Sequence, residues 1–310
     1  MIDFIFNIVF PLTLLGLIII ILLSGLSNRK SVENLMSLDE FIRDWLNDHG
    51  QSQRVEDQLQ QMKRDPSGKI YMPITYKGAK VSIKWGLSPN KVSVINLLLS
   101  FLIFYSVIVA GRGQALDLFT QQPAYGSWFF LIALLVLFTG IIDGVDGGIA
   151  RLLKEKTKSG AWFDNVIDRV SDILMLVCLV PGNLMFLPDF NLNFDWLVWT
   201  NIFIIFIYEY MRARHQGLGL HEDKPYPGER ITRILIIATF FVIYGISSFS
   251  VFLTSLIDPS AVNIWAVSHL GVTSWTMLIL QITLFAIMTF SSIQLARYSF
   301  RNLKKMDKEN

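Results

Sequence analysis

Residues 143–168 read DGVDGGIARLLKEKTKSGAWFDNVID, and long apolar runs flank this stretch on both sides. It carries four carboxylates, Asp143, Asp146, Asp164 and Asp168. The first two are three residues apart and the last two are four apart, so on helices each pair lies on one face about a turn apart. Carboxylates at membrane depth are costly, and a divalent cation is their natural partner. Oxygen ligands without His or Cys favour Mg²⁺ or Mn²⁺ over zinc.

Small residues lie between these carboxylates. Gly144, Gly147, Gly148 and Ala150 remove side-chain bulk next to the acids, although a glycine inside a helix costs about 1 kcal/mol relative to alanine. We therefore expect another group to approach the backbone closely here. Arg151 follows at once, and its forked guanidinium beside a metal suits a diphosphate, whose charge both would share.

The whole stretch has a set of fixed positions at regular gaps. They are Asp143, Asp146-Gly147, Ala150-Arg151, Gly160, Asp164 and Asp168. At every one of these positions the stretch is similar to the signature of the CDP-alcohol phosphotransferases, also called CDP-alcohol phosphatidyltransferases. These are integral-membrane enzymes that make phospholipids from CDP-activated donors. The resemblance covers roughly residues 84–300.

The resemblance implies a role for each signature residue. Asp143, Asp146 and Asp164 would ligate Mg²⁺ or Mn²⁺, and Asp168 would lie at the metal and act as general base on the acceptor hydroxyl. Arg151 would hold the diphosphate. The small residues would leave room for the nucleotide: Gly147, Ala150 and Gly160. The implied reaction transfers a phosphatidyl-type or archaetidyl-type group from a CDP-linked lipid donor to a small alcohol and releases CMP.

The composition is that of a polytopic membrane protein. Of the 310 residues, 52% are hydrophobic and 13% aromatic, which is rare in a soluble chain of this length. The single cysteine excludes both a disulfide within the chain and a zinc site with several Cys ligands.

Apolar runs long enough to cross a hydrocarbon core of roughly 30 Å predict seven spans. They are residues 4–26, 92–111, 126–149, 162–186, 195–213, 232–256 and 274–296. Asp258-Pro259 and His269 interrupt the run from 250 to 273, which is therefore predicted to be an external loop. The first seven residues lack Lys and Arg, which argues against a cleaved signal peptide.

The predicted fold class is therefore all-α, a polytopic membrane helix bundle. By resemblance, a six-span catalytic domain occupies residues 86–300. An extra span at 1–27 and a cytoplasmic juxtamembrane region at 28–85 precede it, and a basic tail at 301–310 follows it. The resemblance also implies a homodimer.

The basic residues predict the orientation of the bundle. Of 27 Lys and Arg, 25 fall in alternate connections, namely residues 27–91, 151–159, 212–233 and 297–310. The positive-inside rule makes these connections cytoplasmic. We expect a multi-pass protein of the plasma membrane with its N-terminus outside, its C-terminus inside and its acidic site facing the cytoplasm.

The polar region after the first span contains two amphipathic segments. Ser37 and Glu40 form a capping box. The helix that follows repeats apolar residues at helical spacing: Leu38, Phe41, Ile42, Trp45 and Leu46. This helix either lies on the membrane or packs against a partner. Residues 76–86 interleave lysines with apolar side chains and read as an interfacial element on anionic lipid rather than a nucleic-acid site.

A second basic group follows the fifth span, with Arg212, Arg214 and Arg230. Converging guanidinium groups would bind an anion, and the pattern is similar to family members whose acceptor carries a phosphate, such as glycerol phosphate or inositol phosphate. The alternative is that these arginines anchor the helix ends at the membrane surface. Asp172 is either a neighbour of the metal ligands or a partner for Arg169.

Two other functions would also explain membrane carboxylates. An Asp-rich membrane prenyltransferase binds a diphosphate through Mg²⁺, but it resembles a different pattern of fixed residues. An ion transporter would use the acids as a transit site, yet Arg151 beside them would repel a cation.

Overall fold

The computed structural model describes residues 4–48, 55–65, 67–112, 126–181, 184–220, 226–258, 260 and 262–309. Nearly all of these residues are helical, so the predicted all-α class is confirmed. The elements are η1 (Ile5–Val9), α2 (Phe10–Gly25), η2 (Leu26–Asn28), α3 (Leu38–Asp48), α4 (Val55–Met62), η4 (Ser67–Tyr71), α5 (Met72–Lys84), α6 (Pro89–Arg112), α8 (Phe129–Leu152), α9 (Lys158–Val177), β1 (Phe186–Leu187), η5 (Pro188–Phe190), β2 (Leu192–Asn193), α10 (Asp195–Gly217), α11 (Arg230–Ile257) and α12 (Val262–Glu309).

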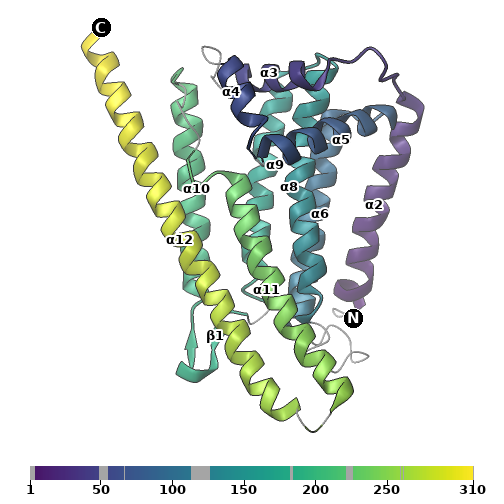
Figure 1. Cartoon of the computed structure of the whole chain (residues 1–310), viewed down its shortest axis with the longest axis vertical. Helices are drawn as coiled ribbons and strands as arrows, with labels where there is room; N and C mark the ends of the chain where they lie inside the picture. Colours follow the sequence, from purple (N-terminus) through teal and green to yellow (C-terminus); the bar gives the residue numbers. More distant parts are fainter. Residues whose placement is uncertain are drawn as a thin grey trace.

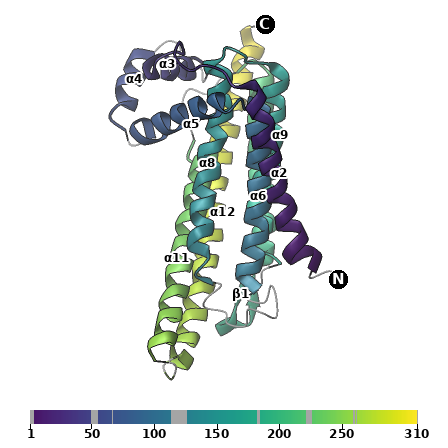
Figure 2. The same ribbon diagram turned by 90° about the vertical axis from the view of Figure 1, so that its right-hand side faces the viewer.

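The long helices α2, α6, α8, α9, α10, α11 and α12 form a bundle with roughly parallel axes (Figure 1). Helices α3, α4 and α5 lie across one end of this bundle and project to one side of it (Figure 2). The C-terminus lies at that same end, and the small antiparallel pair β1–β2 lies at the other. The acids of the 143–168 stretch sit on α8 and α9 near the end that α3 to α5 cover.

Five helices of the described chain are long and apolar enough to cross a membrane. They cover Ile5–Asn28, Pro89–Gly111, Phe129–Leu152, Arg230–Thr254 and Gly271–Lys308. The other two predicted spans exist as helices α9 and α10 but fall below that hydropathy, because both carry several charged residues. Helix α9 also ends at Val177, earlier than the predicted 186.

The predicted external loop over residues 250–273 is wrong. Helix α11 continues to Ile257 and α12 begins at Val262, so both helices extend through that range. Asp258 does end a helix, since it is the C-cap of α11. Asp258 therefore marks the end of α11, His269 lies within α12, and α12 runs for 48 residues.

The predicted capping box is confirmed at the start of α3. The Ser37 backbone N–H donates to Glu40 Oε2 at 2.7 Å, and the Glu40 N–H donates to Ser37 Oγ at 3.4 Å. Phe41, Ile42 and Leu46 are then buried in one cluster with side chains of α5 and α8. The apolar face of this amphipathic helix therefore packs against the chain's own helices α5 and α8.

Helix α5 contains most of the basic segment 76–86 and packs along α8. Ala79 and Ile83 are buried, and the Tyr76 hydroxyl donates to the Met36 carbonyl at 2.8 Å. Lys77 and Lys84 are exposed on the same helix. One face of α5 is thus fixed to the bundle, and contact of its lysines with anionic lipid stays a prediction.

Candidate active site

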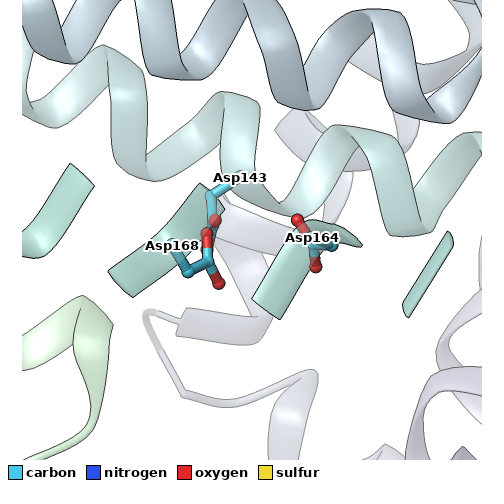
Figure 3. Close-up of side chains that lie close together, drawn as sticks. All are labelled: Asp143, Asp164 and Asp168. Atoms are coloured by element: carbon cyan, nitrogen blue, oxygen red, sulfur yellow. The ribbon is translucent and has the colours of Figure 1, made fainter. Parts of the chain in front are cut away.

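Helices α8 and α9 bring the predicted acids together. The α9 N-terminus is fixed by Thr157, whose hydroxyl accepts from the Gly160 N–H at 3.0 Å. Asp143, Asp164 and Asp168 each offer a carboxylate oxygen, and these oxygens all lie within 4.8 Å of one another. Figure 3 shows Asp143 and Asp168 in close approach, with Asp164 beside them. All three side chains are half-buried.

The fourth acid, Asp146, is more deeply buried than these three, at 4% exposed. Its Oδ2 accepts a hydrogen bond from the Ser93 hydroxyl at 2.5 Å, and its Oδ1 accepts from the Gly147 N–H at 2.5 Å. Its carboxyl also interacts with that of Asp164. The hydroxyl and amide donors orient the Asp146 carboxyl beside the other acids. Ser93 is therefore a residue of the site, although 53 positions separate it from Asp146 in the sequence.

Arg230 lies among the acids. Its Nη1 contacts an oxygen of Asp143 and one of Asp168, and its Nε lies 3.3 Å from Asp172 Oδ1. The structure therefore places Arg230 at the predicted metal ligands. It does not bring Arg230, Arg212 and Arg214 together as one set, since Arg212 pairs with Glu229 at 3.1 Å and Arg214 is exposed in the last turn of α10.

A buried ionic network extends from Arg230 into the bundle. The Arg233 Nη2 lies 2.6 Å from Asp172 Oδ2 and 3.0 Å from Glu209 Oε1. Arg169 adds a contact of 2.8 Å to Glu209 and one of 3.5 Å to Asp172. Asp172 thus contacts Arg169, as predicted, and it also contacts Arg230, the arginine at the acids. Glu209 was overlooked as a site residue, although an acid within a largely apolar helix was a usable signal.

The glycines around the acids serve two different purposes. A Cβ on Gly144 would collide with the Tyr71 hydroxyl of η4 and stand 3.0 Å from Thr75 Cγ2 of α5, and one on Gly148 would stand 3.0 Å from Ala79 Cβ of α5. At these two positions the closely approaching group is the segment formed by η4 and α5. A Cβ on Gly147 would instead meet the Arg151 Nη1 at 3.1 Å, so this glycine leaves room beside the predicted diphosphate ligand.

The acids fit a hard divalent cation. The converging donors are carboxylate oxygens, which Mg²⁺ and Mn²⁺ prefer. Their spread of 4.8 Å is close to the separation of about 4.2 Å between opposite oxygen ligands of Mg²⁺ with bonds of about 2.1 Å.

Comparisons with known proteins agree with the signature. A family model described as CDP-alcohol phosphatidyltransferase matches residues 86–267, which is more than half of the chain. The chain is 28% identical over 175 residues to a bifunctional IPC transferase and DIPP synthase of Aquifex aeolicus, covering 54% of this chain and 35% of that one. It is 26% identical over 180 residues to an archaetidylinositol phosphate synthase of Pyrococcus horikoshii, covering 56% of this chain and 79% of that one.

A solved structure also aligns with the chain. It is the phosphatidylinositol phosphate synthase of Mycobacterium tuberculosis with CDP-DAG bound, at 20% identity and a TM-score of 0.42, covering 70% of this chain and 94% of that one. The chain spans between 29% and 60% of the length of three of the relatives it matches. The match of the family model over residues 86–267 is the decisive finding, and the chain belongs to the CDP-alcohol phosphatidyltransferase family.

Proposed function

We propose that the protein transfers a phosphatidyl-type or archaetidyl-type group from a CDP-linked lipid to an alcohol and releases CMP. The observation that carries the proposal is the convergence of Asp143, Asp164 and Asp168 within 4.8 Å, with the Arg151 guanidinium over Gly147 next to them. Together they provide a hard-cation site and a diphosphate ligand, which is what a CDP-linked donor requires. Membership of the family supports the same reaction.

In this proposal Asp143, Asp146 and Asp164 hold Mg²⁺ or Mn²⁺, with Asp168 at its edge. When bound, the cation would polarise the phosphate oxygens and offset the charge that develops between the two phosphates. Arg151 binds the diphosphate through its planar fork of donors. Gly147 and Gly160 have no side chains, so that the nucleotide can approach the helix backbone at these positions. Ala150 serves the same purpose on α8.

The chemical step needs a base and a path for the leaving group. Asp168 accepts the proton of the acceptor hydroxyl, and that oxygen forms a bond to the phosphorus that carries the lipid. The bond from this phosphorus to the oxygen bridging the two phosphates breaks, and CMP leaves with the electron pair. A carboxylate is a weak base for an alcohol, so orientation of the hydroxyl against Asp168 must supply much of the effect.

We propose an acceptor that carries its own phosphate, such as inositol phosphate or glycerol phosphate. Two named relatives support this class, since one is an archaetidylinositol phosphate synthase and another is a bifunctional IPC transferase and DIPP synthase. Arg212 and Arg214 end α10 and Arg230 begins α11, so all three flank one connection near the acids. Arg230 reaches the acids directly, and Arg212 and Arg214 would contact the acceptor phosphate at the entrance.

We place the site on the cytoplasmic side of the plasma membrane. The connections rich in Lys and Arg gather at the end of the bundle that α3 to α5 cover (Figure 1), and the positive-inside rule makes that end cytoplasmic. We propose the same division of the chain as the sequence suggests: a span at 1–27, a juxtamembrane region at 28–85, a catalytic domain at 86–300 and a tail at 301–310. A homodimer remains a prediction from the family.

The non-enzymatic alternative, a transit site for cations, is disfavoured by the family match. The family model that matches residues 86–267 describes a CDP-alcohol phosphatidyltransferase. The Arg230 guanidinium contacts Asp143 and Asp168, and its fixed positive charge favours a substrate that brings negative phosphate charge to the site.

The test is a reconstituted reaction. Purified protein is incubated with CDP-diacylglycerol or CDP-archaeol, Mg²⁺ and radiolabelled inositol phosphate, glycerol 3-phosphate or serine, and both CMP and labelled lipid are measured. We expect equimolar CMP and lipid product with a phosphorylated acceptor, and none with Asp164→Asn. Absence of product with every donor and acceptor, in protein that remains folded, would refute the proposed function. Product with serine alone would refute the phosphorylated acceptor.

A further inference from the structure

The juxtamembrane helix α3 contacts the signature arginine directly. Arg151 Nε donates to Asp48 Oδ2 at 3.1 Å and lies 3.9 Å from Asp44 Oδ2. Lys156 bridges the same two acids, at 2.5 Å from Asp44 Oδ2 and 2.9 Å from Asp48 Oδ2. Asp44 and Asp48 are four residues apart and therefore lie on one face of α3. This face meets the C-terminal end of α8.

The apolar side chains of α3 fix the helix in place. Phe41 and Leu46 are 1% and 2% exposed, and Phe41 packs 3.6 Å from where a Cβ on Gly148 would stand. Phe41 of α3 thus packs against Gly148, the residue that follows Gly147 in the site. Asp48 is the last residue of this packed helix, and its own side chain is exposed beside Arg151 and Lys156.

The contacts with Asp44 and Asp48 orient the Arg151 guanidinium. Both contacts with the α3 acids are made through Nε, while Nη1 lies over Gly147, 3.1 Å from the position of a Cβ there. The Arg151 side chain is 13% exposed, compared with 42% for Lys156. One edge of the guanidinium is therefore fixed by α3, and the Nη1 end points along α8 toward the space beside the acids.

The acid that fixes Arg151 stays ionised at neutral pH. Partial burial of Asp48 opposes ionisation, but the hydrogen bond from Lys156 and the charge of Arg151 outweigh it, so that the pKa of Asp48 is lowered. Lys156 also offsets the negative charge of Asp44, which it contacts at 2.5 Å. The α3 face therefore orients Arg151 without adding two unbalanced negative charges next to a diphosphate.

We infer that Asp48, supported by Asp44, is a positioning residue that orients Arg151 toward the diphosphate of the CDP-linked donor. This inference rests on the proposed function. It makes α3 part of the donor site although α3 lies outside the segment that matches the family model, residues 86–267. The alternative is that Asp48 weakens donor binding, because it competes with the diphosphate for Arg151.

The test compares Asp48→Asn with a matched charge removal on the same helix. Asp39→Asn also removes one acid from α3 and breaks an ion pair, the exposed one of 2.7 Å with Lys63. Asp48→Glu keeps the charge and serves as the conservative variant. For each protein the Kd for CDP-diacylglycerol in micelles with Mg²⁺, the donor KM, kcat and the melting temperature are measured.

Loss of a charge-assisted bond to an oriented arginine predicts a donor Kd and KM about tenfold higher in Asp48→Asn. We expect kcat to change less than threefold, Asp48→Glu to recover most of the affinity, and Asp39→Asn to match wild type. Equal donor affinity in Asp48→Asn and Asp39→Asn would overturn the inference, and so would tighter binding in Asp48→Asn, which would show competition. If wild-type protein binds neither CDP-diacylglycerol nor CDP-archaeol, the proposed function fails first and the inference falls with it.

Discussion

Removal of Arg233 should destabilise the bundle more than removal of any surface arginine. The Arg233 side chain is 3% exposed and contacts Asp172 and Glu209, which are 8% and 6% exposed. It also donates to the Gly228 carbonyl at 2.7 Å. Breaking a buried ion pair by removing one partner costs about 3–5 kcal/mol. Arg169 and Arg230 remain beside the two acids, so we expect Arg233→Met to cost about 3 kcal/mol, the lower end of that range.

This free energy predicts a measurable shift in melting temperature. With about 2.1 cal/mol/K of unfolding entropy per residue, a chain of this size should lose about 5 °C. The assay is thermal unfolding in detergent with EDTA present, so that metal binding does not contribute. Arg43→Met is the control, because Arg43 pairs with Glu56 at the exposed surface, where both side chains are at least 41% exposed. We expect the control to unfold at the wild-type temperature.

A second variant tests the reason for the loss. If uncompensated acid is the cause, adding Glu209→Gln to Arg233→Met should recover part of the stability, since the double variant buries one charge fewer. A melting temperature for Arg233→Met within 1 °C of wild type would refute the reasoning, and so would a further fall in the double variant.

Other predictions address the site itself. EDTA should abolish activity and Mg²⁺ or Mn²⁺ should restore it, whereas Zn²⁺ should not; Asp143→Asn should lose metal-dependent donor binding in the same equilibrium assay. Asp168→Asn should lower kcat by about 10²–10⁴ and change donor Kd by less than about tenfold, and a parallel fall of both would identify a ligand rather than a base. Gly148→Val should lower stability by about 1–3 kcal/mol because α5 occupies that space, while Gly147→Ala should keep the melting temperature and weaken donor binding. Arg212→Lys should raise the acceptor KM and leave the donor KM unchanged in steady-state kinetics, whereas a mere membrane anchor would tolerate this change.

The sequence predicted best the features that depend on local spacing. The acids of α8 and α9 were expected on single helix faces, and the structure brings three of the four within 4.8 Å. The capping box at Ser37 and Glu40 was equally predictable, because its two hydrogen bonds join residues three apart. In both cases the relevant geometry follows from the helical repeat alone.

Contacts between distant segments could not be predicted in this way. Ser93 and Asp146 meet across 53 residues, and Arg230 meets Asp143 across 87. Periodicity tells which face of α3 is apolar, but it does not tell that this face packs on α8 or that its acids reach Arg151. The predicted length of the loop between α11 and α12 was too great for a related reason. Hydropathy indicates which residues can lie in the membrane, but a helix can continue beyond the membrane.

During synthesis the acids of the cluster are made before the arginine that pairs with them. Asp143 and Asp168 belong to the neighbouring helices α8 and α9, which can pair as soon as both have left the ribosome, since local contacts form first. Arg230 follows Asp168 by 62 residues and begins α11, so a newly inserted α8–α9 hairpin would hold its carboxylates before their guanidinium partner exists. Because unpaired carboxylates at membrane depth are costly, we expect the α8–α9 hairpin to gain stability when α11 inserts and brings Arg230 to these acids. Late insertion of Arg230 then completes the charge balance of a site whose acids were already assembled.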